Sequence, residues 1–230
     1  MKDHHLESIK NLEADGLLVK SRESNATFAL DLADDLDFYA LGDNVLSVFV
    51  DKKGLIGTEK ISKKERKHIK QQFAELDDVI DFDIKFVKSK RKADVAFSKF
   101  NSILDDLGED SLGFWNSDPN AFGFGISSVI WEDSVIEGDK KLSTFDTLTT
   151  ISHEIGHMLG LEHPITEFFD DHPNTIMGGD EQIEQEGPFL TQEDLNLIVK
   201  GWAVYRSNPD IWAYQSTGWC DCGQGQFCKT

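Results

Sequence analysis

The feature that most constrains this chain is the spacing of His153, Glu154, His157, Gly160 and His163. Residues four apart lie on the same face of an α-helix, so the spacing predicts a helix from which His153 and His157 point at one position. Glycine tolerates the positive φ at which a helix ends in a sharp turn, so Gly160 predicts the end of this helix. The reversal would bring His163 to the same position from another direction.

Three imidazoles in this pattern are a typical ligand set for a catalytic Zn²⁺, which takes protein nitrogens at about 2.0–2.1 Å and keeps a fourth position for water. Glu154 is displaced around the helix from the two ligands, so we expect it to act as a general base towards that water. The chemistry indicated is metal-assisted hydrolysis of a peptide bond. A solvated helix face with unpaired histidines is the alternative, and Gly160 and His163 argue against it.

With these residues the chain resembles the metzincin metallopeptidases, whose zinc motif is followed by a methionine turn beneath the metal. Met177 follows His163 by fourteen residues and is similar to that turn. Within the metzincins the serralysin and matrixin group is most similar, because Pro164 follows the third histidine as in serralysins. The resemblance covers about residues 40 to 205 and implies a zinc-dependent endopeptidase.

The resemblance also implies the fold: an α+β architecture with a twisted mixed sheet, an antiparallel edge strand, long helices that include the active-site helix, and a C-terminal helix. Residues 61–78 resemble the first helix of the family, and residues 83–87, 93–97, 121–125 and 129–133 resemble sheet segments. The segment 121–125 is implied to be the edge strand. Its residues Ala121, Phe122, Gly123 and Phe124 would then offer backbone hydrogen bonds to an extended substrate.

The sequence departs from both families in its details. Gly179 stands where serralysins carry a tyrosine that can touch the zinc. Matrixins have a second zinc site and a cysteine-bearing propeptide, but no histidine lies between His68 and His153 and no cysteine precedes Cys220. The calcium-binding glycine-rich repeats of many serralysins are also missing. The resemblance therefore implies a minimal catalytic domain.

Local patterns predict several elements without the resemblance. Residues 45–50 carry β-branched residues in weak alternation, which indicates a strand. Ser62 with Glu65 forms a capping box, and Thr191 with Asp194 resembles the start of a last helix. Ser143 or Thr144 could cap the active-site helix. Residues 101–120, rich in Asp, Gly and Asn, are expected to form a loop.

At 230 residues the chain is long enough for one substantial domain. Residues 1–36 are polar and are expected to form an appended helix or mobile arm, residues 37–206 the catalytic domain, and residues 207–230 a cysteine-containing tail. The odd count of Cys220, Cys222 and Cys228 allows one intrachain disulfide, for which Cys222–Cys228 is our expectation. A tail thiolate that binds the zinc and keeps an enzyme latent is a further hypothesis.

The formal net charge of −19 lies almost entirely in residues 101–230, which hold 5 Lys and Arg against 23 Asp and Glu. Such a field repels nucleic acid and attracts cations. It suggests structural Ca²⁺ on acidic loops at 105–110, 170–171 and 180–186, or a preference for basic peptides. A solvated acidic surface is the alternative.

Basic residues concentrate instead in the segments 52–70 and 85–92. They could form a phosphate-binding patch, but Glu59, Glu65 and Asp94 interrupt them in sequence. We therefore interpret the first segment as the solvated face of a helix. The remaining histidines, His4, His5, His68 and His172, lack ligand spacing and are expected at the surface, although His172 could line the cleft.

No run of 18 apolar residues is present, which argues against a transmembrane helix. The first residues lack the apolar region of a cleaved secretory signal, so secretion by another route is favoured over a cytoplasmic location. We expect a monomer that acts on protein or peptide substrates, with no nucleic-acid or membrane partner. The alternatives are a non-catalytic zinc-bound module that binds peptides or proteins, and a latent protease of narrow specificity.

Overall fold

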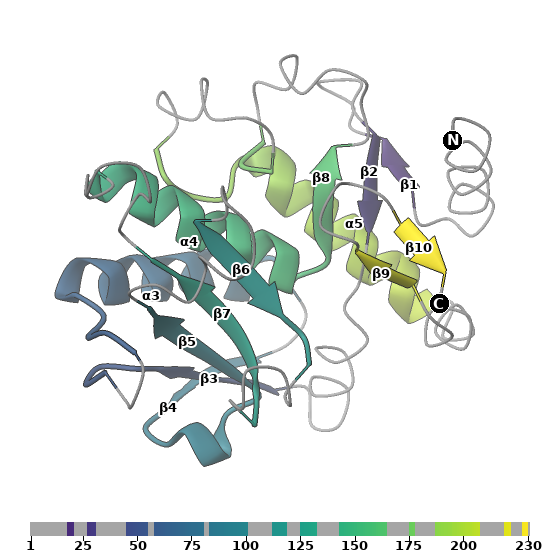
Figure 1. The fold of residues 1–230 in the computed structure, drawn as a ribbon. Helices are drawn as coiled ribbons and strands as arrows, with labels where there is room; N and C mark the ends of the chain where they lie inside the picture. The colour runs from purple at the N-terminus through teal and green to yellow at the C-terminus, as the bar shows by residue number, and fades with distance from the viewer. Residues whose placement is uncertain are drawn as a thin grey trace.

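The computed structural model describes residues 18–20, 27–30, 45–54, 58–80, 83–100, 112–118, 125–132, 143–164, 175–177, 187–207, 219–221 and 227–229. Its main sheet has five strands in the order β4-β3-β5-β7-β6 (Figure 1). All neighbouring pairs are parallel except β6 with β7, which is antiparallel. The strands are β3 (Val45–Val50), β4 (Asp83–Val87), β5 (Val95–Lys99), β6 (Gly113–Asn116) and β7 (Ser127–Trp131).

Within the described residues, three α-helices accompany the sheet: α3 (Lys63–Asp77), α4 (Thr144–Met158) and α5 (Gln192–Ser207). A short 3₁₀ helix, η1 (Lys90–Lys92), joins β4 to β5. The predicted capping box of α3 is present, and Ser143, not Thr144, caps α4. These reciprocal bonds satisfy backbone N–H groups that would otherwise lack partners at the helix start, which fixes where both helices begin.

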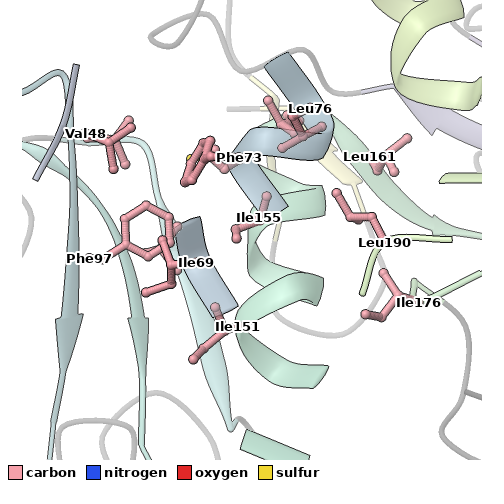
Figure 2. Packing of buried hydrophobic residues seen from close by; sticks show 14 of the residues in the cluster. Val48, Ile69, Phe73, Leu76, Phe97, Ile151, Ile155, Leu161, Ile176 and Leu190 are labelled. Atoms are coloured by element: carbon pink, nitrogen blue, oxygen red, sulfur yellow. The ribbon is translucent and has the colours of Figure 1, made fainter. Parts of the chain in front are cut away.

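The main hydrophobic core lies between the sheet and helices α3 and α4 (Figure 2). The periodic residues of α3, Ile69, Phe73 and Leu76, are each at most 1% exposed, as their spacing predicts. Strands β5 and β7 are buried along their whole length, which is usual for central strands of a parallel sheet. Residues beyond α4, including Leu161, continue the same core, so α4 is held on two sides.

Among the described strands, the antiparallel edge strand is β6, at 113–116. It lies inside the segment 101–120, which was expected to form a loop. The sequence did not predict this strand, because the surrounding segment is polar and glycine-rich. The strand is also short, and three of its four residues are only partly buried. The sheet segment expected at 129–133 begins two residues earlier in the structure, because β7 spans Ser127–Trp131. Residues 121–124 lie outside the described part of the chain.

The expectation of an appended helix or mobile arm is wrong for two short segments of the first 36 residues. Strands β1 (Leu18–Lys20) and β2 (Thr27–Leu30) form a second sheet with β8 (Leu161–Pro164), in the order β1-β2-β8 (Figure 1). The β2 strand is antiparallel to β8, which directly follows α4. Composition could not reveal this pairing because the partners are more than 130 positions apart.

The C-terminal segment contains an antiparallel pair, β9 (Trp219–Asp221) and β10 (Phe227–Lys229). Its register places Cys220 directly opposite Cys228. Cys222 lies outside the described residues, so the expected Cys222–Cys228 disulfide remains a prediction.

Among the described helices, none has the length and apolar character needed to cross a membrane.

Candidate active site

The three histidines of the motif meet at one place, at the end of α4. His153 and His157 lie one turn apart on α4, as their spacing predicts. Gly160 follows the helix with φ of 90°, and β8 then carries His163 back towards α4. The positive φ at Gly160 is the conformation that glycine adopts most easily, so the reversal follows from the sequence.

The imidazole nitrogens are close enough to share a cation. His153 Nε2 lies 3.1 Å from His157 Nε2 and 3.0 Å from His163 Nε2. Around a tetrahedral Zn²⁺ with bonds of 2.0–2.1 Å, neighbouring ligand atoms would be about 3.3 Å apart. Two of the three pairs thus have nearly the spacing that a zinc ion requires, and all three ligand atoms lie within 4.8 Å of one another.

Two of the rings are held by backbone carbonyls, which fixes their protonation. His153 Nδ1 is 2.9 Å from the carbonyl oxygen of Ile176, and His157 Nδ1 is 2.7 Å from that of Leu161. A carbonyl oxygen only accepts hydrogen bonds, so in each neutral ring Nδ1 carries the proton and Nε2 carries the lone pair. Lone pairs that face one another at 3.1 Å repel unless a cation lies between them, and the donor set therefore fits a divalent metal.

The electrostatics of the site keep these rings neutral. Burial, together with the neighbouring His163, lowers the pKa of His153 to about 4, although its bond to Ile176 opposes the change. Burial and the two other histidines hold the pKa of His157 well below its ordinary value. Neutral imidazole is the form that binds metal, so the site is ready to take an ion at neutral pH.

Met177, the residue expected to form a methionine turn, packs against α4. It is 1% exposed, and a Cβ built on Gly156 would come 2.5 Å from its sulfur. Only glycine at 156 lets the helix approach the turn this closely. The preceding carbonyl, of Ile176, is the one that accepts from His153, so the turn supports both the helix and a predicted ligand.

The turn itself is held by Asp194, a buried residue of α5 that is 0% exposed. Its carboxylate accepts hydrogen bonds from the Thr175 hydroxyl and from the Ile176 N–H, the latter at 3.0 Å. It also accepts from the backbone and hydroxyl of Thr191, which begins α5 as predicted. One carboxylate thus connects the cap of α5 to the peptide that orients His153.

Glu154, the predicted general base, lies beside the edge strand β6. It is 5% exposed, and a Cβ added to Gly113 would come 2.7 Å from both its Cγ and its Oε1. Gly113 was not predicted to matter, because it falls in the segment expected to be a loop. The absence of a side chain at 113 is what lets the strand pass directly over this carboxylate.

Replacing Gly113 with alanine is expected to lower catalytic efficiency by about 10- to 100-fold while leaving metal content unchanged, because the base would be displaced by a fraction of an ångström or more. The added methyl group would meet Glu154 at 2.7 Å and Thr150 Cγ2 at 2.6 Å. Steady-state kinetics and metal analysis measure the two effects. The double variant Gly113→Ala with Thr150→Ser removes the second clash only. Recovery of full activity in that variant would mean that the effect does not act through Glu154.

His68 is buried, which corrects the expectation that it lies at the surface. It is 2% exposed, its Nε2 lies 2.7 Å from Ser152 Oγ, and its ring packs against Phe189 with centroids 4.6 Å apart. The Ser152 hydroxyl in turn donates to the carbonyl of Pro188 at 2.8 Å. These contacts connect α3 to the residue before His153 and to the segment that leads into α5.

Burial lowers the pKa of His68 to about 4, with a hydrogen bond to the Leu148 backbone acting in the opposite direction. In the unfolded chain the pKa is about 6.5, so between pH 6.5 and 4 the unfolded state binds the extra proton. The native state therefore loses stability as the pH falls through this range, by about 3 kcal/mol from this residue.

The variant His68→Gln cannot titrate, so its unfolding free energy should depend less on pH than that of the wild type between pH 6.5 and 4. Urea unfolding of both proteins at several pH values, with chelator present, measures this difference. The site histidines titrate equally in both proteins and cancel in the comparison. Parallel pH curves would show that His68 does not make this contribution.

Several predicted site features fall outside the described residues. They are the substrate segment Ala121–Phe124, Gly179, His172, and the acidic loops at 105–110, 170–171 and 180–186 that were considered for calcium. These remain predictions. Asp194 could have been singled out from the sequence only as a helix cap, since its contacts to Thr175 and Ile176 span 18 or more positions.

Comparison with known proteins adds a distant likeness. No protein family and no curated protein matches the chain. Among solved structures, one described as "Structure of myroilysin" is similar with a TM-score of 0.41 and 14% identity, over 67% of this chain and 90% of that chain. At this TM-score the likeness carries no argument about function. What the geometry establishes is an α+β protein whose three histidines could hold a metal ion.

Proposed function

We propose that this protein is a zinc-dependent endopeptidase of the metzincin type. The observation that carries the proposal is the convergence of His153, His157 and His163. The His153 Nε2 atom lies 3.0 Å from that of His163 and 3.1 Å from that of His157. A buried carboxylate, Glu154, lies next to the first ligand on the same helix. This combination of a cation site and an adjacent acid is what metal-assisted hydrolysis requires.

Zn²⁺ held by the three histidines would lower the pKa of a bound water to about 7 and polarise the scissile carbonyl. The part of Glu154 in this chemistry is to accept a proton from the attacking water at its carboxylate and to return it to the leaving amine. Its burial beneath β6 keeps bulk water away, so the carboxylate interacts with the reacting groups at low effective dielectric. The Ile176 and Leu161 carbonyls keep two of the rings in the tautomer that ligation needs.

The position of β6 supports a peptide as the substrate. It is the edge strand of the sheet and is antiparallel to β7, and its Gly113 lies over Glu154. An extended peptide could add to this edge by backbone hydrogen bonds, which would place its carbonyls along the site. Whether residues 121–124 also contact the substrate, as the family resemblance implies, remains a prediction.

Metal analysis of the purified protein together with a quenched-fluorescence peptide library tests the proposal. We expect about one zinc per chain, cleavage of several peptides, loss of cleavage with a chelator, and recovery when zinc is restored. Peptide binding without cleavage would favour the non-catalytic binding module instead. Cleavage that survives complete removal of the metal would contradict the proposed chemistry.

A further inference from the structure

A basic hollow, separate from the histidine site, is lined by six cationic side chains. It has a volume of about 480 Å³, and its lining residues come from α3 and from the ends of β3 and β4. Six of the chain's 23 Lys and Arg residues line it, although the chain has a net charge of −19. The six are Lys52, Lys63, Arg66, Lys67, Lys70 and Lys88.

The fold explains how residues from separate segments meet there. Residues 63, 66, 67 and 70 have the spacing of one helix face, so they lie together along the first two turns of α3. Strands β3 and β4 are parallel, with Phe49 paired to Val87, so both end at the same border of the sheet. Lys88 directly follows β4, and Lys52 is the second residue after β3. The carboxyl ends of parallel strands are a common position for ligands.

The acidic residues that interrupt these lysines in the sequence do not neutralise the hollow. Glu65 is 4% exposed and pairs with the buried Lys99 at 3.2 Å, and Glu59 lies 4.0 Å from the same ammonium. Asp94 accepts a hydrogen bond of 2.7 Å from the backbone of Ser47. None of these three acids lines the hollow. The basic face of α3 is exposed to solvent, as predicted, but these three acids do not offset its charge in three dimensions.

The remaining neighbouring acid, Asp51, is also turned inward. It is 1% exposed and accepts hydrogen bonds from the backbone of Lys53 and Gly54 and from the hydroxyl of Thr58. Within the described part of the chain, none of the six lining cations takes part in an ion pair. Their mutual repulsion is unfavourable and would be relieved by an anion with several charges.

The floor of the hollow is apolar and well fixed. Val50, Phe86 and Val87 contribute it, and the Phe86 ring stands edge-on to the buried Phe73 with centroids 5.8 Å apart. The Lys70 ammonium lies 5.5 Å from the centre of the Phe86 ring, within the range of a cation–π contact. Phe86 nevertheless remains 37% exposed. The hollow thus combines a rigid apolar base with cations around it.

We propose that this hollow binds a compact ligand that carries several phosphate groups. A volume near 480 Å³ is within the range of small-molecule sites, which favours a compact anion. The acidic remainder of the protein would repel a long nucleic acid. Lysine and arginine are the usual partners of phosphate, through charge-assisted hydrogen bonds. The hollow shares no residue with the histidine site, so this ligand is not the peptide substrate.

Tripolyphosphate is the probe for calorimetric titration of the full chain at low ionic strength. The variant Lys63→Glu with Lys67→Glu should bind it at least about tenfold more weakly than the wild type, because two cations of the hollow become anions. The matched control is Lys60→Glu with Lys64→Glu, which changes the net charge equally at two exposed residues that do not line the hollow. When the titrations are repeated at an ionic strength of about 0.15 M, where the Debye length is about 8 Å, the control should bind within about threefold of the wild type, because charges that do not contact the ligand are then largely screened.

Equal weakening in both double variants would overturn the proposal, because it would mean that only the overall charge matters. The absence of tripolyphosphate binding to the wild type would also overturn it. Any extraction of metal by the probe is common to all three proteins and cancels in the comparison. A second arm uses neutral vesicles with and without a phosphoinositide. Phosphoinositide-dependent binding that is lost only in the Lys63 and Lys67 variant would support the site and identify a lipid headgroup as the source of the phosphates. Binding of tripolyphosphate alone would support a free phosphate ligand.

Discussion

Replacing Glu154 with glutamine is expected to reduce peptide hydrolysis by about 10²- to 10⁴-fold while the protein keeps its metal. Glutamine has nearly the same shape, so it fits the narrow space beside Gly113, where even one added carbon would come within 2.7 Å. It cannot accept a proton from the attacking water at neutral pH. Turnover of a quenched peptide measures the loss of hydrolysis, and metal content per chain measures whether the ion is retained.

The matched control for this experiment is His157→Ala, which removes a predicted ligand and should lower metal content and activity together. The contrast separates loss of the base from loss of the ion. If Glu154→Gln turned over peptide as fast as the wild type, another residue would have to accept the proton, and the proposed role of Glu154 would be wrong.

The sequence predicted the parts of the site that depend on short-range geometry. A four-residue spacing on a helix places His153 and His157 on one face, and a glycine three residues later permits the turn at φ of 90°. The capping residues of α3 and α4 were also readable, because the partners of a capping box are three positions apart. For these features the physical cause lies within a few residues of its effect.

The parts that were missed depend on contacts between distant segments. Gly113 approaches Glu154 from a strand more than 40 positions upstream, and its short, partly buried strand has no strong periodicity. The pairing of β2 with β8 joins the N-terminal region to the strand that carries His163. His68 was expected at the surface because its burial is decided by Ser152 and Phe189, neither of which is near it in sequence.

The basic hollow illustrates the same distinction in electrostatics. Net charge along a segment can be counted from the sequence, but the direction in which each acid points cannot. Glu65 follows the lysines at 63 and 64 directly, yet it lies in the core, paired with Lys99 and accepting a 3.3 Å hydrogen bond from Trp131 Nε1. Lys63, Lys67 and Lys70, which belong to the same helix, line the hollow instead. The alternation of exposed and buried positions on α3 therefore separates opposite charges that adjoin in sequence.

Asp194 is the remote residue on which the histidine site depends most. Burial raises its pKa above the usual value, and hydrogen bonds from Thr175, Ile176 and Thr191 act in the opposite direction. Ile176 is central to this arrangement, because its N–H donates to Asp194 and its carbonyl accepts from His153. A change at Asp194 should therefore affect both stability and the orientation of a predicted ligand.

Replacing Asp194 with alanine is expected to lower the free energy of unfolding by about 3–5 kcal/mol, since it leaves buried N–H and hydroxyl donors without their acceptor. Metal affinity should fall by about 10- to 100-fold, as is typical when a residue that supports a ligand is removed. Chemical denaturation and metal titration measure these changes. Asp194→Asn keeps the shape and one acceptor, so it should show smaller losses of both kinds and remains measurable if the alanine variant does not fold. Unchanged metal affinity in a folded Asp194→Ala protein would show that the turn orients His153 without help from this carboxylate, because the Ile176 peptide would then hold its place through the packing of Met177 alone.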